Sequence, residues 1–163
     1  MDNNVKKLEE EFAELENLLL EYNKIGLEIM KVDSEEVELL SDKIGERDEL
    51  IQKMDKIKIE CSALIDSFEG EEPGIIRGML TGSGANRSMI GRLSPLKNAI
   101  ISLRSAQLQA AETDKTLQIQ FASRMEEAKE QLMRLKNDKK KLDYYSSVNP
   151  TQNIIGGSLD SSF

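Results

Sequence analysis

Few residues of this chain are of the types that carry out catalysis or bind ligands. The sequence has no histidine, which excludes a Ser-His-Asp or Cys-His arrangement and a zinc site of the usual kind. The glycines from Gly78 to Gly84 are spaced somewhat as in a phosphate-binding loop. Such a loop needs a Gly-Lys-Ser/Thr sequence, and Gly82-Ser83-Gly84-Ala85 has no lysine. The glycine pattern therefore predicts a flexible connector.

Clustered carboxylates are the second candidate for chemistry. Glu9, Glu10 and Glu11 are consecutive, as are Glu126 and Glu127. None lies in the twelve-residue loop with which helical proteins commonly bind calcium, so solvated helix faces are the better interpretation. We expect no catalytic residue, no metal and no cofactor, although lysine- or carboxylate-based catalysis stays formally open.

Composition and charge narrow the classes of partner. The 163 residues are 39% hydrophobic, 32% charged and 4% aromatic, with a net charge of −8. Amphipathic helices fit this balance, whereas nucleic acid and anionic membranes prefer a basic surface. No apolar run is long enough to span a membrane. The single cysteine, Cys61, precludes an internal disulfide, and we expect a cytoplasmic protein.

One basic segment departs from the acidic average. It contains Arg134, Lys136, Lys139, Lys140 and Lys141. Positive side chains near the end of a helix compensate the helix dipole and aid solubility, which is the simpler interpretation. Docking on an acidic partner surface is the alternative.

Hydrophobic spacing predicts three helices over residues 3–31, 34–68 and 94–145. The stripe of the first is Val5, Leu8, Phe12, Leu15, Leu19, Tyr22 and Ile29. That of the second is Leu40, Ile44, Ile51, Met54, Cys61, Ile65 and Phe68, with Arg47 and Lys58 at two heptad positions and Leu39, Leu50, Ile57 and Leu64 beside it. Asp33 or Ser34 is the expected cap of the second helix.

The third helix is expected to begin at Ser94-Pro95, a capping residue followed by proline. Its stripe is Leu96, Ile100, Leu103, Ala110, Leu117, Phe121, Ala128, Leu132, Leu135 and Leu142, with Met125 beside it. Between Ala106 and Asp114 large apolar residues are scarce, so we expect close packing through alanines or a slight bend.

The fold class follows from these elements. We expect an all-α protein: an antiparallel helical hairpin plus a long C-terminal helix, forming one coiled-coil-like three-helix domain over residues 1–145. Residues 69–93 are rich in glycine, which predicts a connector with at most a short helical turn near Gly74 to Leu80. Residues 146–163 predict a flexible tail without order of its own.

The predicted helices differ in length, so the third must extend beyond the hairpin. The extension carries Leu117, Phe121, Met125, Ala128, Leu132 and Leu135. An apolar stripe with no partner in its own chain predicts a partner elsewhere, either a client helix or a second copy of the chain. We favour a client protein over homodimerisation.

Three segments resemble the bacterial flagellar export chaperones of the FlgN and FliT type. Leu39-Leu40-Ser41-Asp42-Lys43-Ile44-Gly45-Glu46-Arg47-Asp48-Glu49-Leu50-Ile51 is similar to their second helix. Asp114-Lys115-Thr116-Leu117 resembles a polar stretch in their long C-terminal helix, and Lys139-Lys140-Lys141-Leu142-Asp143-Tyr144-Tyr145 resembles its basic end. The glycine-rich segment 69–93, the serine-rich end and the doubled tyrosine depart from that pattern.

The resemblance implies a cytoplasmic chaperone that binds the C-terminal helix of a late flagellar export substrate. The substrate would be a hook–filament junction protein for the FlgN type and the filament cap for the FliT type. On this reading the stripe from Leu117 to Leu135 binds the client, and Tyr144 or Tyr145 contacts the export apparatus. The alternative is a structural coiled-coil protein that dimerises or acts as a scaffold.

Overall fold

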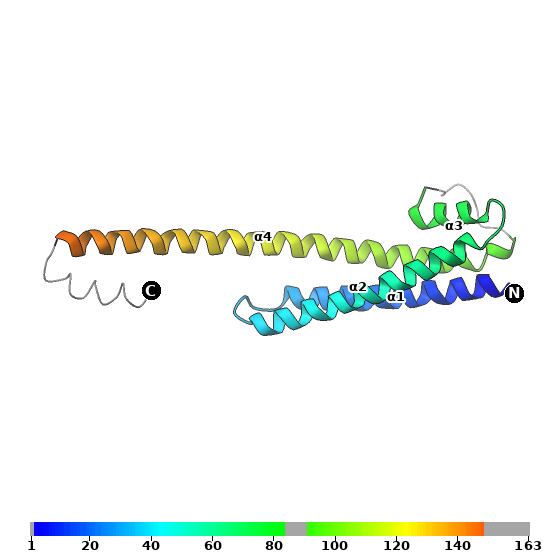
Figure 1. Ribbon diagram of the computed structural model, residues 1–163, viewed down its shortest axis with the longest axis horizontal. Coiled ribbons are helices and arrows are strands. Elements are labelled where there is room, and N and C mark those ends of the chain that lie inside the picture. Colours follow the sequence, from blue (N-terminus) through cyan, green and yellow to red (C-terminus); the bar gives the residue numbers. More distant parts are fainter. Residues whose placement is uncertain (1, 84–90, 149–163) are drawn as a thin grey trace. The chain divides into compact units, whose positions relative to one another are not determined.

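The computed structural model describes residues 2–83 and 91–148, and the regular secondary structure in them is entirely helical. The helices are α1 (Asn3–Met30), α2 (Val37–Asp66), α3 (Glu72–Thr81), the short 3-10 helix η1 (Gly91–Leu93) and α4 (Leu96–Val148) (Figure 1). The expected all-α class is confirmed. Contacts divide the chain into two units, Met1–Leu117 and Gln118–Phe163, and this division falls within the predicted 1–145 domain.

Helices α1 and α2 form the antiparallel hairpin that the short connection predicts (Figure 1). The Asp2 carboxylate begins α1 by accepting a hydrogen bond from the Asn4 backbone N–H at 3.0 Å. The Asn4 side-chain amide lies 3.4 Å from the Ser67 hydroxyl just after α2. Near the other end, Arg47 of α2 donates to the Tyr22 carbonyl of α1. The start of one helix therefore lies beside the end of the other.

The core of the hairpin confirms the predicted α1 stripe and corrects that of α2. Every predicted apolar residue of α1 is buried except Tyr22, which is half-buried. On α2, Ile44 and Ile51 are exposed although they were predicted in the stripe. The helix instead buries a row that draws on both predicted rows, Leu50, Met54, Ile57, Cys61 and Ile65. Apolar residues three and four apart lie on one face of a helix, and α2 has two such rows side by side. The sequence does not decide which of the two rows packs against a neighbouring helix.

The predicted cap of α2 is also wrong. Its N-cap is Glu36 rather than Asp33 or Ser34, and no side-chain capping hydrogen bond forms there. The intervening residues form a turn in which the Glu36 N–H donates to the Asp33 carbonyl at 3.0 Å. Val32 in this turn is buried. The backbone hydrogen bonds and this buried side chain stabilise the turn. Helix α2 therefore starts at Val37, later than the predicted start at residue 34.

Part of the predicted connector is a helix that extends beyond the short helical turn expected near Gly74 to Leu80. Helix α3 has Pro73 in its first turn and ends at Thr81, and its C-cap is Gly82, whose positive φ of 78° suits glycine. Ile76 is fully buried, and its burial offsets the poor helix propensity of Gly74 and Gly78. Residues 84–90 of the predicted connector lie outside the described residues.

Helix α4 starts two residues after the predicted start and ends at Val148. Pro95 comes just before the helix rather than at its first position, because η1 (Gly91–Leu93) precedes it. In unit 1 the helix buries Leu96, Ile100 and Leu103, and then Ala106 and Ala110, so the predicted packing through alanines is confirmed. Residues 149–163 of the predicted tail lie outside the described part of the chain.

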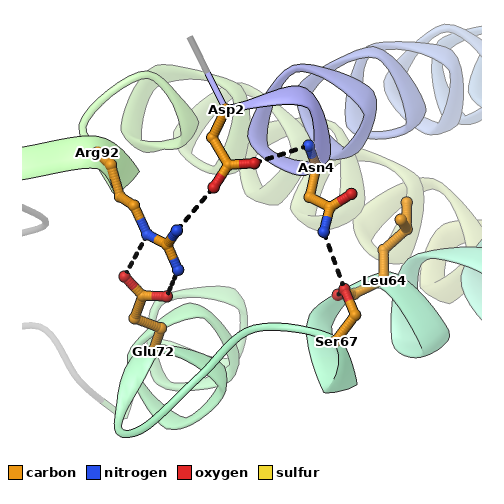
Figure 2. Close-up of polar contacts among 6 residues, drawn as sticks. All are labelled: Asp2, Asn4, Leu64, Ser67, Glu72 and Arg92. Atoms are coloured by element: carbon orange, nitrogen blue, oxygen red, sulfur yellow. Dashed lines mark hydrogen bonds and ion pairs between the residues drawn. The ribbon is translucent and has the colours of Figure 1, made fainter.

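Ionic contacts link the start of α1 to α3 and η1 at one end of unit 1. The Arg92 guanidinium lies 2.7 Å from an Asp2 carboxylate oxygen and pairs through two nitrogens with Glu72 (Figure 2). Asp114, farther along the chain, contacts Tyr22. Because Arg92 meets Asp2 and Asp114 meets Tyr22, the first part of α4 runs parallel to α1 and antiparallel to α2.

Candidate protein-binding surface

Cys61 is a core residue rather than a reactive thiol. It is buried on α2. Burial raises the pKa of its thiol to about 11, and the carboxylates of Glu11 and Glu60 add to the shift. A thiol with this pKa has almost no thiolate at neutral pH, so it is a poor nucleophile. Within the described residues no three potential ligands are grouped to bind a metal ion.

A polar cluster that joins α1, α2 and α4 is formed by Tyr22, Arg47 and Asp114. The Arg47 Nη2 lies 2.6 Å from Asp114 Oδ1, and the Tyr22 hydroxyl donates to the same carboxylate at 3.0 Å. The Arg47 guanidinium also lies 3.6 Å from the centre of the Tyr22 ring. Burial raises the pKa of the Tyr22 phenol, the Arg47 charge opposes that shift, and the bond to Asp114 adds to it. The three groups satisfy one another, so their arrangement links α4 to the hairpin.

Beside this cluster is a shallow open depression with a volume of about 260 Å³. Its lining includes Tyr22, Ile51, Lys58 and Asp114. The volume lies below the usual range for small-molecule sites of about 300–1,000 Å³. Both carboxylates of its lining are already paired, Asp114 with Arg47 and Asp55 with Lys58. The depression is therefore a weaker candidate than the surface of unit 2.

The described side chains of unit 2 form a surface with an uncovered apolar stripe. None of the side chains of residues 118–147 is buried. Met125 is 62% exposed, Leu132 58% and Leu135 66%. We call the stripe the unit 2 seam: Phe121, Met125, Ala128, Leu132, Leu135 and Leu142. Its steps are four, three, four, three and seven, which is the heptad spacing of a coiled-coil interface.

The structure places the predicted client-binding residues in two environments. Leu117 is only 4% exposed and belongs to the core of unit 1. The prediction that it lies on the exposed client-binding surface is therefore wrong. Phe121 is half-buried, and Ala128 is exposed together with the larger residues of the seam. Leu117 is the last buried residue of α4 among the described side chains, so the boundary between the core of unit 1 and the seam lies between Leu117 and Phe121.

The predicted export-apparatus contact lies on the exposed surface near the end of α4. Tyr144 and Tyr145 are both exposed, and their rings meet edge to face with centres 5.9 Å apart. The basic residues from Arg134 to Lys141 are exposed as well. These facts agree with a surface role for both groups but assign them no partner.

Two exposed apolar residues of unit 2 were not anticipated. Ile119 and Met133 are mostly exposed, and neither belongs to the predicted stripe. At 100° per residue they lie on the side of the helix away from the seam. Isolated apolar side chains are common on protein surfaces, so they define no second binding surface.

Comparisons with known proteins identify no relative. No protein-family model matches the sequence, and neither the curated proteins nor the solved structures contain a match. In the described residues no helix is long and apolar enough to cross a membrane.

Proposed function

We propose that this chain is a chaperone that binds an amphipathic helix of another protein on the unit 2 seam. The observation that carries the proposal is the exposed heptad stripe on a helix with no buried side chain from residue 118 to 147. Most helices gain their stability from packing an apolar face, and α4 has such a face without a covering element in the described part of unit 2. A second helix would supply the missing contacts.

The flagellar setting of the proposal rests on the three segments that resemble FlgN- and FliT-type chaperones. We propose that the client is the C-terminal helix of a hook–filament junction protein or of the filament cap. Binding in the cytoplasm covers the apolar face of that helix and prevents its premature assembly. Tyr144 and Tyr145 are available for the export apparatus because both are exposed.

Calorimetry with the full chain tests this function. The titrants are synthetic C-terminal helices of the junction and cap proteins encoded in the same genome. We expect one helix bound per chain, with a negative heat-capacity change because apolar surface is buried. Absence of binding heat and of co-elution for all these helices would contradict the proposal.

A matched pair of variants locates the binding surface. Leu132→Asp places a charge in the seam and should weaken binding at least about tenfold, since burying one leucine contributes about 1.5–3 kcal/mol. Leu108→Asp makes the same change on an exposed residue of α4 in unit 1 and should leave binding unchanged. Equal effects of the two variants would place the client elsewhere.

The rival function is a coiled-coil scaffold in which two copies of the chain pair through the seam. An exposed heptad stripe is the observation that favours it. Light scattering during size-exclusion chromatography distinguishes the two. We expect a monomer, and a dimer that Leu132→Asp dissociates would support the scaffold instead.

A further inference from the structure

The charges beside the seam restrict which helix can pair with it. With Met125 and Leu132 at heptad position a, and Phe121, Ala128, Leu135 and Leu142 at position d, positions e and g flank the stripe. Between Phe121 and Leu135 the flanking charged residues are Arg124 and Lys129, and Lys136 follows directly. No carboxylate occupies an e or g position until Asp138. The first part of the seam therefore has cationic edges.

The acids of this region lie on the other side of the helix. Glu126, Glu127 and Glu130 are at positions b, c and f, which point away from a partner at the seam. Lys129 does pair with Glu126 at 3.5 Å, but both side chains are largely exposed. Such a pair contributes little and does not neutralise the edge of the seam.

A second copy of the chain fits these edges poorly. In a parallel pair, position g of one helix faces position e five residues later on the other. Arg124 would then face Lys129 of the second copy, and Asp138 would face Asp143. In the antiparallel register with the fullest overlap, e faces e, so Lys129 would face Lys136. Like charges in either arrangement disfavour pairing.

A membrane surface also fits less well than a protein helix. Cations beside an apolar face are common in helices that lie on anionic membranes. Here the apolar face is a narrow two-position stripe interrupted by Lys139, as in a coiled-coil interface, whereas membrane-surface helices have wider apolar faces. The carboxylates on the outer face add no attraction to anionic lipid.

We propose that the seam is selective for a helix of another protein with acidic residues beside its own apolar stripe, opposite Arg124, Lys129 and Lys136. This inference rests on the proposed function and specifies its client. The acidic partner side chains pair with the three cations, while the apolar stripes supply most of the affinity. The segment from Phe121 to Leu142 extends about 33 Å at about 1.5 Å per residue, so the matching helix has about three heptads.

Two designed peptides of three heptads test the inference on the full chain. Both have leucine at a and d and the same neutral residues at b, c and f. One has glutamate at every e and g position and the other has lysine, so neither pairs well with itself at pH 7. Fluorescence anisotropy should show that the glutamate peptide binds at least about tenfold more tightly, with a ratio that falls as salt is added.

Charge-reversal variants locate the selectivity. Arg124→Glu, Lys129→Glu and Lys136→Glu together should reverse the preference between the two peptides. The control combines Arg134→Glu, Lys140→Glu and Lys141→Glu, which makes the same charge change at outer positions b and c. The control should still prefer the glutamate peptide. If both triple variants shift the ratio equally, net charge rather than the edges of the seam determines binding, and the inference is overturned.

Other outcomes separate this inference from the proposed function. If both peptides bind equally and Leu132→Asp removes both, the seam binds helices without charge selection, so only the inference fails. If neither peptide binds while an export-substrate helix does, the inference again fails alone. If the peptides and the substrate helices all fail to bind, both proposals fail. Sedimentation of the chain with phosphatidylserine-containing vesicles, abolished by Leu132→Asp, would assign the seam to a lipid surface and overturn the inference.

Discussion

Two glycines of the hairpin should respond in opposite ways to alanine. Gly45 lies on α2 with no atom within 4 Å of the position that a Cβ would take. Gly26 lies on α1, where a Cβ would meet the Thr113 Cγ2 of α4 at 2.9 Å and the Arg47 Nη2 of α2 at 3.0 Å. Gly26 therefore lies where α1, α2 and α4 pack closely, with no room for a Cβ.

The magnitudes follow from helix propensity and overpacking. Alanine is better than glycine in a helix interior by about 1 kcal/mol, so Gly45→Ala should raise the free energy of unfolding by about that amount. Gly26→Ala gains the same term but forces the stiff, β-branched Thr113 side chain and the Arg47 guanidinium to move. Overpacking of this kind costs about 1–3 kcal/mol, so we expect no gain or a net loss of up to about 2 kcal/mol.

Urea unfolding of the full chain, followed by circular dichroism, measures both variants against the original sequence. The double variant Gly26→Ala with Thr113→Ser removes the contacting methyl group and should recover part of the loss. If Gly26→Ala stabilises the chain as much as Gly45→Ala does, α4 does not pack against the hairpin at this point, and the reasoning is refuted.

Three other predictions concern the polar groups and the thiol of unit 1. Asp114→Ala should lower the free energy of unfolding by about 1.5–3 kcal/mol, because it removes a charged hydrogen bond from Arg47, whose side chain is 11% exposed. An unchanged free energy in urea unfolding would show that the cluster is not formed. Hydrogen bonding to Arg92 lowers the pKa of the Glu72 carboxyl below 4.5, so this pair stabilises the fold above that pH and the contribution disappears as pH falls through the lower folded value. Arg92→Gln should reduce the loss of stability between pH 5 and pH 2, and an unchanged pH profile would contradict that assignment. Cys61 should react with a thiol reagent at pH 7 only as fast as the chain unfolds, and immediate labelling would show that it is accessible.

The sequence predicts most of the fold because heptad spacing and short connections leave few arrangements for long helices. The α1 stripe shows this, since every residue predicted in it is buried except Tyr22, which is half-buried. On α2 two adjacent apolar rows compete, and the sequence alone does not reveal that Leu50 and Ile57 are buried while Ile44 and Ile51 are exposed. Helix α3 escaped full prediction because its glycines oppose helix formation locally, whereas burial of Ile76 favours it through a tertiary contact.

The candidate surface was partly predictable for the same physical reason. The unequal lengths of the predicted helices indicate an uncovered apolar stripe on the third, and Met125, Leu132 and Leu135 are exposed. The boundary was not predictable, because Leu117 has the same spacing and residue type as the seam but is buried. The link between Arg47 and Asp114 also escaped prediction, since residues that distant in sequence reveal a pairing only when the helix register is known.

Hydrogen–deuterium exchange along α4, with and without the client helix, tests the central claim most directly. The account predicts slow exchange for residues 96–117 in both samples. It predicts fast exchange for residues 118–148 in the free chain, because a helix without packed side chains opens readily, and slowing of at least about tenfold when the client is bound. Equally slow exchange of both segments in the free chain, unaltered by the client, would mean that the seam is already covered and would contradict the account.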